Sequence, residues 1–245
     1  AVRVVTPGQY TNIATVIAAE PAGAGTVTDA DPSNHFGVVS AIVIEKETNG
    51  FDADDPTGPL VPVGSTVDFD YAVSNAGNVP LDIISVVDNN GTLDDGDNFM
   101  PDPVTGVGIF NIGDTNENGL LDTDEIWRYD ADRTATPGQY TNVAVVTADA
   151  PLDVLVTDSD SSNHFGVVSA IVIEIATNGC DADDATGPLV PVGSTVDFDY
   201  AVSNAGNVPL DIISVVDNNG TLDDGDNFMP DPVTGVGIFN IGDTN

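Results

Sequence analysis

Apolar and polar residues alternate along much of this chain with a period of two. In the segment STVDFDYAVSN (65–75), Val67, Phe69, Tyr71 and Val73 fall on one side and polar residues on the other. Such alternation is typical of a β-strand with one buried face. The same reasoning predicts strands in VVSAIVIE (38–45), VPLDIISVV (79–87), GVGIFNI (106–112), EIWRYDA (125–131), YTNVAVVTA (140–148) and VLVTDSD (154–160).

The strand pattern is repeated. Residues 34–116 recur as residues 163–245 with four differences, and TPGQYTN occurs at 6–12 and at 136–142. The differences are Lys46 to Ile175, Glu47 to Ala176, Phe51 to Cys180 and Pro56 to Ala185. Seven or so short strands per repeat of about 129 residues predict an all-β fold of tandem immunoglobulin-like β-sandwiches.

The frame of the repeat predicts three domains. Residues 1–37 form the C-terminal part of one repeat, residues 38–166 a complete repeat, and residues 167–245 the N-terminal part of a further repeat. Either the chain is a window of a long tandem array, or its two ends complete each other between neighbouring chains. Both alternatives predict a linear, head-to-tail arrangement of repeats, within one chain or between chains.

Composition restricts the partners. The chain carries 40 acidic and 4 basic residues, a net charge of -36, yet 41% of its residues are hydrophobic, as in a folded domain. So few cations cannot neutralise a phosphate backbone, which excludes nucleic-acid binding. An anionic membrane would repel the chain, and no apolar stretch approaches the roughly 20 residues of a membrane-spanning helix. The lone Cys180 excludes an internal disulfide, which leaves a divalent cation as the candidate cross-link.

One loop has the spacing of a calcium site. DTNENGLLDTDE (114–125) matches the D-x-[DN]-x-[DN]-G-x5-E pattern, in which oxygen ligands surround one ion and a glycine allows the sharp turn. Its flanks are predicted strands, so we expect a structural calcium site without EF-hand helices. The alternative is a solvated acidic turn. The predicted ligands are Asp114, Asn116, Asn118, the Leu120 carbonyl, Asp122 and Glu125.

Other acidic clusters are less specific. The second copy of the loop stops at Asp243 and Asn245, without its glutamate, so this metal loop is incomplete. Clustered carboxylates repel one another unless a cation lies among them. We therefore weigh a second, interdomain calcium site against a solvated acidic rim. Its candidate ligands are Asp52, Asp54, Asp55, Asp158, Asp160, Asp181, Asp183 and Asp184.

The remaining candidates for chemistry have few partners. His35 and His164 both occur in SNHFG and have no cysteine or second histidine in the same repeat, so we expect them to pack against the domain junction rather than catalyse or bind zinc. Lys46 could form an intramolecular isopeptide bond, but Ile175 replaces it in the copy, so this cross-link would not be general. Without a phosphate loop or a nucleophile elbow, we expect no enzyme.

These motifs together resemble a known family. The segments TNG-x-DAD, YAVSNAGNVPL, GDTNENGLLDTDEIWRY, TPGQYTN and DSD-x-SNHFG are similar to tandem immunoglobulin-like repeats of very large bacterial cell-surface, adhesin-type and extracellular matrix proteins. The resemblance implies secretion, stiffening by calcium, and a spacer or fibre role. We therefore expect a calcium-stiffened extracellular filament or adhesin stalk. The alternative is an adhesin module that binds a glycan or mineral surface.

Overall fold

A computed structural model describes residues 2–23, 25–106, 108–222 and 224–232. The chain divides into two compact units, residues 1–166 and 167–245, while the further boundary predicted after residue 37 stays a prediction. The incomplete metal loop with Asp243 and Asn245 lies outside the described residues. The strands are β1 (Gly8–Ala19), β2 (Thr26–Gly37), β3 (Ile42–Thr48), β4 (Phe51–Asp52), β5 (Leu60–Pro62), β6 (Thr66–Asn75), β7 (Asp82–Asp88), β8 (Asp102–Pro103), β9 (Ile126–Thr134), β10 (Gly138–Ala150), β11 (Val154–Val167), β12 (Ile171–Thr177), β13 (Cys180–Asp181) and β14 (Phe198–Asn204). The helical segments are short 3-10 turns, η1 (Pro21–Gly23), η2 (Asp95–Asp97) and η3 (Asp224–Asp226).

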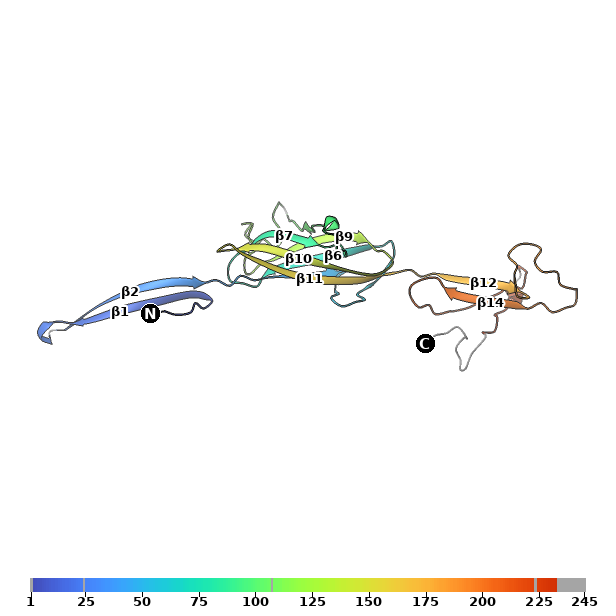
Figure 1. The fold of residues 1–245 in the computed structure, drawn as a ribbon, viewed down its shortest axis with the longest axis horizontal. Helices are drawn as coiled ribbons and strands as arrows, with labels where there is room; N and C mark the ends of the chain where they lie inside the picture. The colour runs from blue at the N-terminus through green and yellow to red at the C-terminus, as the bar shows by residue number, and fades with distance from the viewer. Residues whose placement is uncertain (1, 24, 107, 223, 233–245) are drawn as a thin grey trace. The chain divides into compact units, whose positions relative to one another are not determined.

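The complete repeat is a sandwich of two antiparallel sheets (Figure 1). One sheet has the strand order β4-β3-β6-β9-β8, and the other has the order β5-β11-β10-β7. The predicted all-β sandwich is therefore confirmed. No helix within the described ranges is long and apolar enough to cross a membrane.

Strand β6 lies at the centre of its sheet and shows why the alternation produces a core. Val67, Phe69, Tyr71 and Val73 are almost completely buried, whereas the intervening aspartates face solvent. The opposite sheet contributes Val146 of β10, which is also fully buried, to the same hydrophobic cluster. Burial of each such side chain contributes about 1.5–3 kcal/mol to folding, so this interior provides the main stabilisation of the repeat.

The strand predicted in GVGIFNI is wrong. Residues 108–112 form no strand; within them, Asn111 makes only an isolated bridge with Thr105. The Asn111 side chain accepts a hydrogen bond from the Arg128 backbone N–H (2.9 Å) and donates one to the Arg128 carbonyl (2.6 Å). The Asn111 side chain thus pairs with the backbone N–H and carbonyl of Arg128 in β9, where the sequence predicted a neighbouring strand. Gly113 follows, and a Cβ there would lie 1.8 Å from the Ile126 carbonyl oxygen.

The partial repeats keep the strands of their counterparts. Strands β1 and β2 form a two-stranded hairpin in the same register as β10 and β11. Strands β12, β13 and β14 form a three-stranded sheet of order β13-β12-β14, which corresponds to β4-β3-β6 of the complete repeat. Each partial repeat therefore contains strands that, in the complete repeat, pack against strands of the other half.

Candidate assembly faces and cation-binding sites

The hairpin of the first partial repeat exposes apolar side chains. Val16 of β1 is 62% exposed, whereas its counterpart Val146 is 0% exposed inside the complete sandwich. Ile13 and Ile17 are also more than half exposed, but they lie on the opposite face of the strand, because successive side chains alternate. An isolated two-stranded hairpin is marginally stable in water, so the face that contains Val16 requires a covering layer.

The second partial repeat exposes the complementary face. Ile171, Ile173 and Phe198 are each about half exposed. In the complete repeat the matching residues of β3 and β6 are buried against the sheet that contains β10. Those matching residues are Ile42, Ile44 and Phe69. The apolar surface left open by 167–232 is therefore of the kind that a hairpin such as β1–β2 covers.

The predicted calcium loop folds around the carboxylate of Asp114. Its Oδ1 accepts a hydrogen bond from the backbone N–H of Asn118 (3.1 Å), and its Oδ2 accepts one from Gly119 (2.9 Å). Gly119 has a φ of +77°, a conformation that favours glycine. The tight turn required by the motif is thus present, and it places the Asp114 carboxylate inside the loop.

Glu125, directly before β9, closes the loop. Its Oε1 accepts hydrogen bonds from the backbone N–H and the hydroxyl of Thr115 (2.8 and 2.9 Å), and its Oε2 accepts from the Asp122 N–H and the Trp127 indole (3.2 and 3.3 Å). Burial raises the pKa of Glu125, but these hydrogen bonds outweigh burial and lower it. Glu125 is therefore held as a carboxylate at neutral pH.

The other residues predicted as ligands also belong to this turn. Asn116 and Asn118 donate side-chain hydrogen bonds to Asp122 Oδ2 (2.7 and 3.0 Å). The Asn118 side-chain oxygen accepts from the Leu120 N–H, which orients the Leu120 peptide within the loop. The structure thus gathers the predicted ligand residues into one loop.

The electrostatics of the loop fit a hard cation. Asp114 and Glu125 are 5% and 3% exposed. Among the described residues neither forms an ion pair with a lysine or arginine. Calcium prefers carboxylate oxygens of this kind, and a bound cation would balance the charge of the two buried carboxylates. Calcium binding itself remains a prediction.

The second predicted cation site is gathered only in part. Burial, followed by the charges of Asp160 and Asp52, raises the pKa of Asp54, and Asp55 adds to the effect. Sequence reasoning missed Glu45, whose pKa is raised by burial and then by the charges of Asp160, Asp52 and Asp54. Glu45 precedes the buried Lys46 on β3, and its outward position was the signal available in the alternation.

The remaining predicted acids divide by unit. In 167–232, Asp181 and Asp183 lie with Glu174 so that their carboxylate oxygens are within 4.8 Å of one another, and Asp184 follows in the same loop. In the complete repeat, Asp158 Oδ2 instead accepts from the Ile44 N–H (3.0 Å). One oxygen of Asp160 likewise accepts from the Lys46 N–H (2.7 Å). These two aspartates of β11 accept hydrogen bonds from backbone N–H groups of β3 and thereby link the two sheets.

The histidine of the complete repeat is packed, but within the sandwich and not at the expected domain junction. His164 of β11 is 0% exposed and lies 4.8 Å from the Tyr140 ring and 6.3 Å from the Phe69 ring, between centroids. Burial, with the charges of Arg133 and Lys46, lowers the pKa of His164 to about 4. The residue is therefore a neutral part of the sandwich interior and not part of a domain junction.

Comparisons with known proteins identify no family. No protein-family model matches the chain, and no curated protein sequence does. Two solved structures of BcpA, the major pilin subunit of Bacillus cereus, and of a variant of it, share 11% identity with TM-scores of 0.35 and 0.34. The alignments cover 80% of this chain and 64% of the pilin, so the chain spans less than two thirds of that subunit. At these TM-scores no argument about function rests on the likeness.

Proposed function

We propose that this chain is a structural repeat protein of an extracellular filament or stalk, in which immunoglobulin-like repeats follow one another head to tail. The observation that carries the proposal is the pair of complementary apolar faces, on β1–β2 and on 167–232. In a tandem array the covering strands come from the same chain, and in a polymer they come from a second copy.

The complete repeat defines the expected interface. There, β10 and β11 provide the strands that cover β3 and β6, and Val146, Ile44 and Phe69 belong to one buried cluster. Addition of a hairpin to an incomplete sandwich supplies both main-chain hydrogen bonds and apolar burial. Residues 167–245 repeat 38–116 with four differences, and the hairpin shares the TPGQYTN and SNHFG segments and the register of β10 and β11. A second copy of this chain is therefore the partner that fits.

We further propose that calcium stiffens the filament. The loop at 114–125 holds the residues predicted as ligands within the complete repeat, and the acidic rim around Glu45, Asp54 and Asp160 carries mutual repulsion that a divalent cation would relieve. Small-angle scattering with calcium and with a chelator tests this property. A longer particle in calcium is expected, and identical profiles would contradict stiffening.

Self-association is tested with the full chain and two matched variants. Val16→Asp places a charge on the face whose counterpart is buried, and Thr15→Asp places one where the counterpart, Val145, is 39% exposed. In sedimentation velocity over a concentration series, the native chain and Thr15→Asp are expected to associate, and Val16→Asp is expected to stay monomeric. A native chain that is monomeric throughout would contradict completion by a second copy.

The second candidate function, glycan binding, has one observation in its favour. Phe51 is 61% exposed beside Asp52 and Asp54, and together with neighbouring residues they line an open depression of about 700 Å³. An exposed ring next to carboxylates can stack on a sugar and accept its hydroxyl hydrogen bonds. Glycan-array binding that is lost in Phe51→Cys, the residue of the copy, would support this function over a purely structural one.

A further inference from the structure

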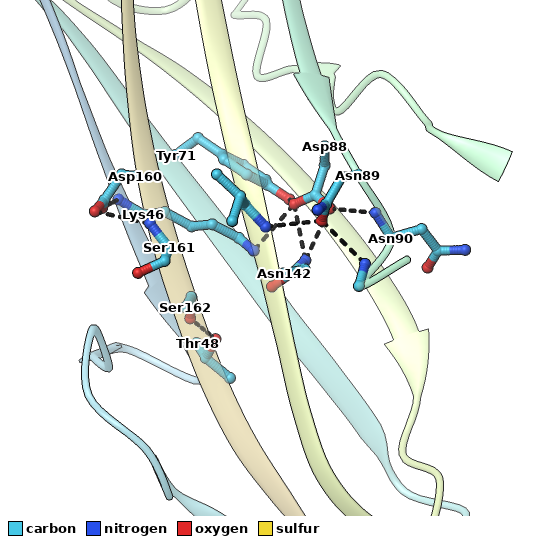
Figure 2. Close-up of polar contacts among 12 residues, drawn as sticks. Lys46, Thr48, Tyr71, Asp88, Asn89, Asn90, Asn142, Asp160, Ser161 and Ser162 are labelled. Atoms are coloured by element: carbon cyan, nitrogen blue, oxygen red, sulfur yellow. Dashed lines mark hydrogen bonds and ion pairs between the residues drawn. The ribbon is translucent and has the colours of Figure 1, made fainter. Parts of the chain in front are cut away.

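Three polar side chains meet in the interior of the complete sandwich. Lys46 comes from β3, Asp88 from the end of β7 and Asn142 from β10, and Figure 2 shows them pointing toward one another. All three are 0% exposed. They therefore join the two sheets inside the apolar core. Burial of charged groups there costs folding free energy unless ion pairing and hydrogen bonds compensate for the lost hydration.

Asp88 is the centre of the cluster. Its Oδ2 lies 3.0 Å from Lys46 Nζ and accepts the Tyr71 hydroxyl at 2.8 Å. The Asn142 side-chain N–H₂ lies 2.9 Å from Oδ1 and 2.8 Å from Oδ2. The carboxylate thus contacts both the amine and the amide nitrogen, and holds them on the same side of the core.

Two atoms of the cluster lack hydrogen bonds. Among the described residues, Lys46 Nζ has only the ion pair with Asp88 and no hydrogen bond of good geometry, and Asn142 Oδ1 has no partner. Burial lowers the pKa of Lys46 to about 8, although Asp88 opposes the shift. The surroundings are aromatic, with Nζ 4.3 Å from the centre of the Phe69 ring. An amine in such a place is readily present in its neutral, nucleophilic form.

We propose that Lys46 and Asn142 become joined by an amide bond between Nζ and Cγ, with Asp88 as the catalytic acid and base. In this arrangement the buried charge of Lys46 disappears. The new bond would connect the first long strand of one sheet to the central strand of the other.

The step balances without a co-reactant. Asp88 takes a proton from the Lys46 ammonium, and the neutral Nζ attacks Asn142 Cγ to form a tetrahedral intermediate. The protonated Asp88 then returns a proton to the departing Nδ2, the Cγ–Nδ2 bond breaks, and one ammonia molecule leaves. Of the two protons left on Nζ, one is lost through the same carboxylate and the other stays on the new amide nitrogen. Asp88 pairs with Lys46 Nζ and accepts hydrogen bonds from Asn142 Nδ2, so its carboxylate contacts both nitrogens between which the protons move.

The second copy separates this chemistry from the fold. There, Tyr200 still donates to Asp217, but Ile175 replaces the lysine. The copy therefore supplies the replacement residue for the test variant, Lys46→Ile. The inference does not depend on head-to-tail assembly, because all three residues lie in one repeat.

Intact mass spectrometry of the folded full chain tests the bond. The native chain is expected to be lighter than its calculated mass by one ammonia, and trypsin is expected to leave Lys46 uncut, with its peptide joined to the one that contains Asn142. Lys46→Ile and Asn142→Ala are expected at their full calculated masses. A folded native chain at full mass, cleaved after Lys46, would overturn the proposal.

Two controls separate the cross-link from ammonia loss elsewhere in the chain. Asn-Gly sequences such as Asn90-Gly91 can also lose ammonia through succinimide formation, so ammonia loss that persists in Lys46→Ile would overturn the assignment. Asp88→Asn retains both the amine and the amide but removes the proton carrier, and it is expected to keep its full mass. If the bond forms in Asp88→Asn as fast as in the native chain, the catalytic role assigned to Asp88 is wrong. Circular dichroism of each variant establishes that it is folded.

Discussion

The Tyr200 hydroxyl donates a 2.6 Å hydrogen bond to Asp217, and Tyr71 donates a 2.8 Å hydrogen bond to Asp88 at the matching position of the complete repeat. The partial repeat has therefore retained the acid of the proposed cross-link and its tyrosine partner. It lacks the amine, because Ile175 stands where the complete repeat has Lys46, and the counterpart of the amide residue Asn142 is Asn12 of the hairpin.

This relationship predicts that one substitution will link chains covalently. If the hairpin of one chain completes residues 167–245 of the next, Asn12, the counterpart of Asn142, will come next to Asp217. The variant Ile175→Lys would then supply the missing amine, and we expect a ladder of covalent oligomers on denaturing gels. The native chain is expected to run as a single band.

The control for this ladder is Ile175→Lys combined with Asn12→Ala, which keeps the new amine but removes the amide that it would attack. The double variant is expected to lose the ladder. A single band in Ile175→Lys, together with an intact Lys46–Asn142 bond, would contradict head-to-tail completion and leave the cross-link within the repeat standing.

The sequence predicted the strands better than it predicted their chemistry. Alternation in 65–75 is enough to place Phe69 and Tyr71 in the core, because a strand has only two faces. Lys46 stood out in the sequence, but its reactivity depends on Asp88 and Asn142, and nothing local indicates that 88 and 142 will meet it. Similarly, the alternation in GVGIFNI could not reveal that the Asn111 side chain would occupy the place of a strand.

Calcium is expected to stabilise the native chain through the 114–125 loop. At a calcium concentration about 100 times the dissociation constant, the gain is about 2.7 kcal/mol in unfolding free energy. Trp127 donates to Glu125, so its fluorescence, and terbium emission sensitised by it, report on this site. Glu125→Gln is expected to abolish the calcium-dependent change in Trp127 fluorescence and the sensitised terbium emission. Thermal melts with calcium and with chelator measure the stability.

The matched control for the loop is Asp124→Asn, which also removes one negative charge. Asp124 is exposed and occupies no ligand position of the motif. It is expected to retain terbium emission and the calcium-dependent melt. If Glu125→Gln and Asp124→Asn behave alike, the effect is one of general charge rather than of a calcium site.

Removal of a charge at the acidic rim is expected to raise the melting temperature without cations and to lower it when a cation is bound. The pKa of Asp54 is raised, so its ionised form destabilises the fold at neutral pH. In chelator, Asp54→Asn should therefore melt at a higher temperature than the native chain. If a cation binds there, calcium will reverse the order. Asp70→Asn, on an exposed position of β6, is the control and should show no reversal.

His164 is expected to make the sandwich sensitive to acid. Its pKa is about 4 in the folded state, below the value of about 6.5 in an unfolded chain, so the unfolded chain binds the extra proton between these two pH values. Stability is thus complete above pH 6.5 and decreases as the pH falls toward 4, by on the order of 3 kcal/mol. Denaturant titrations of His164→Leu should lack this component, whereas His35→Leu in the hairpin should retain it.

The proposed cross-link also predicts how the complete repeat extends under force. An amide bond between Lys46 and Asn142 removes residues 47–141 from the path between the two ends of the repeat. At about 3.3–3.6 Å per residue, those residues would add roughly 300 Å to the unfolded length. Single-molecule stretching should therefore give a native extension shorter by that amount than the extension of Lys46→Ile.

Equilibrium unfolding should show the same bond, because closing a loop of nearly 100 residues stabilises the fold by about 4–5 kcal/mol in the chain-entropy estimate. Glu47→Ala is the control, since it introduces the residue of the copy next to Lys46 and leaves the amine in place. It should keep the short extension and most of the stability. Equal extensions in the native chain and in Lys46→Ile would show that residues 47–141 are free to unravel, and that no covalent bond holds β3 to β10.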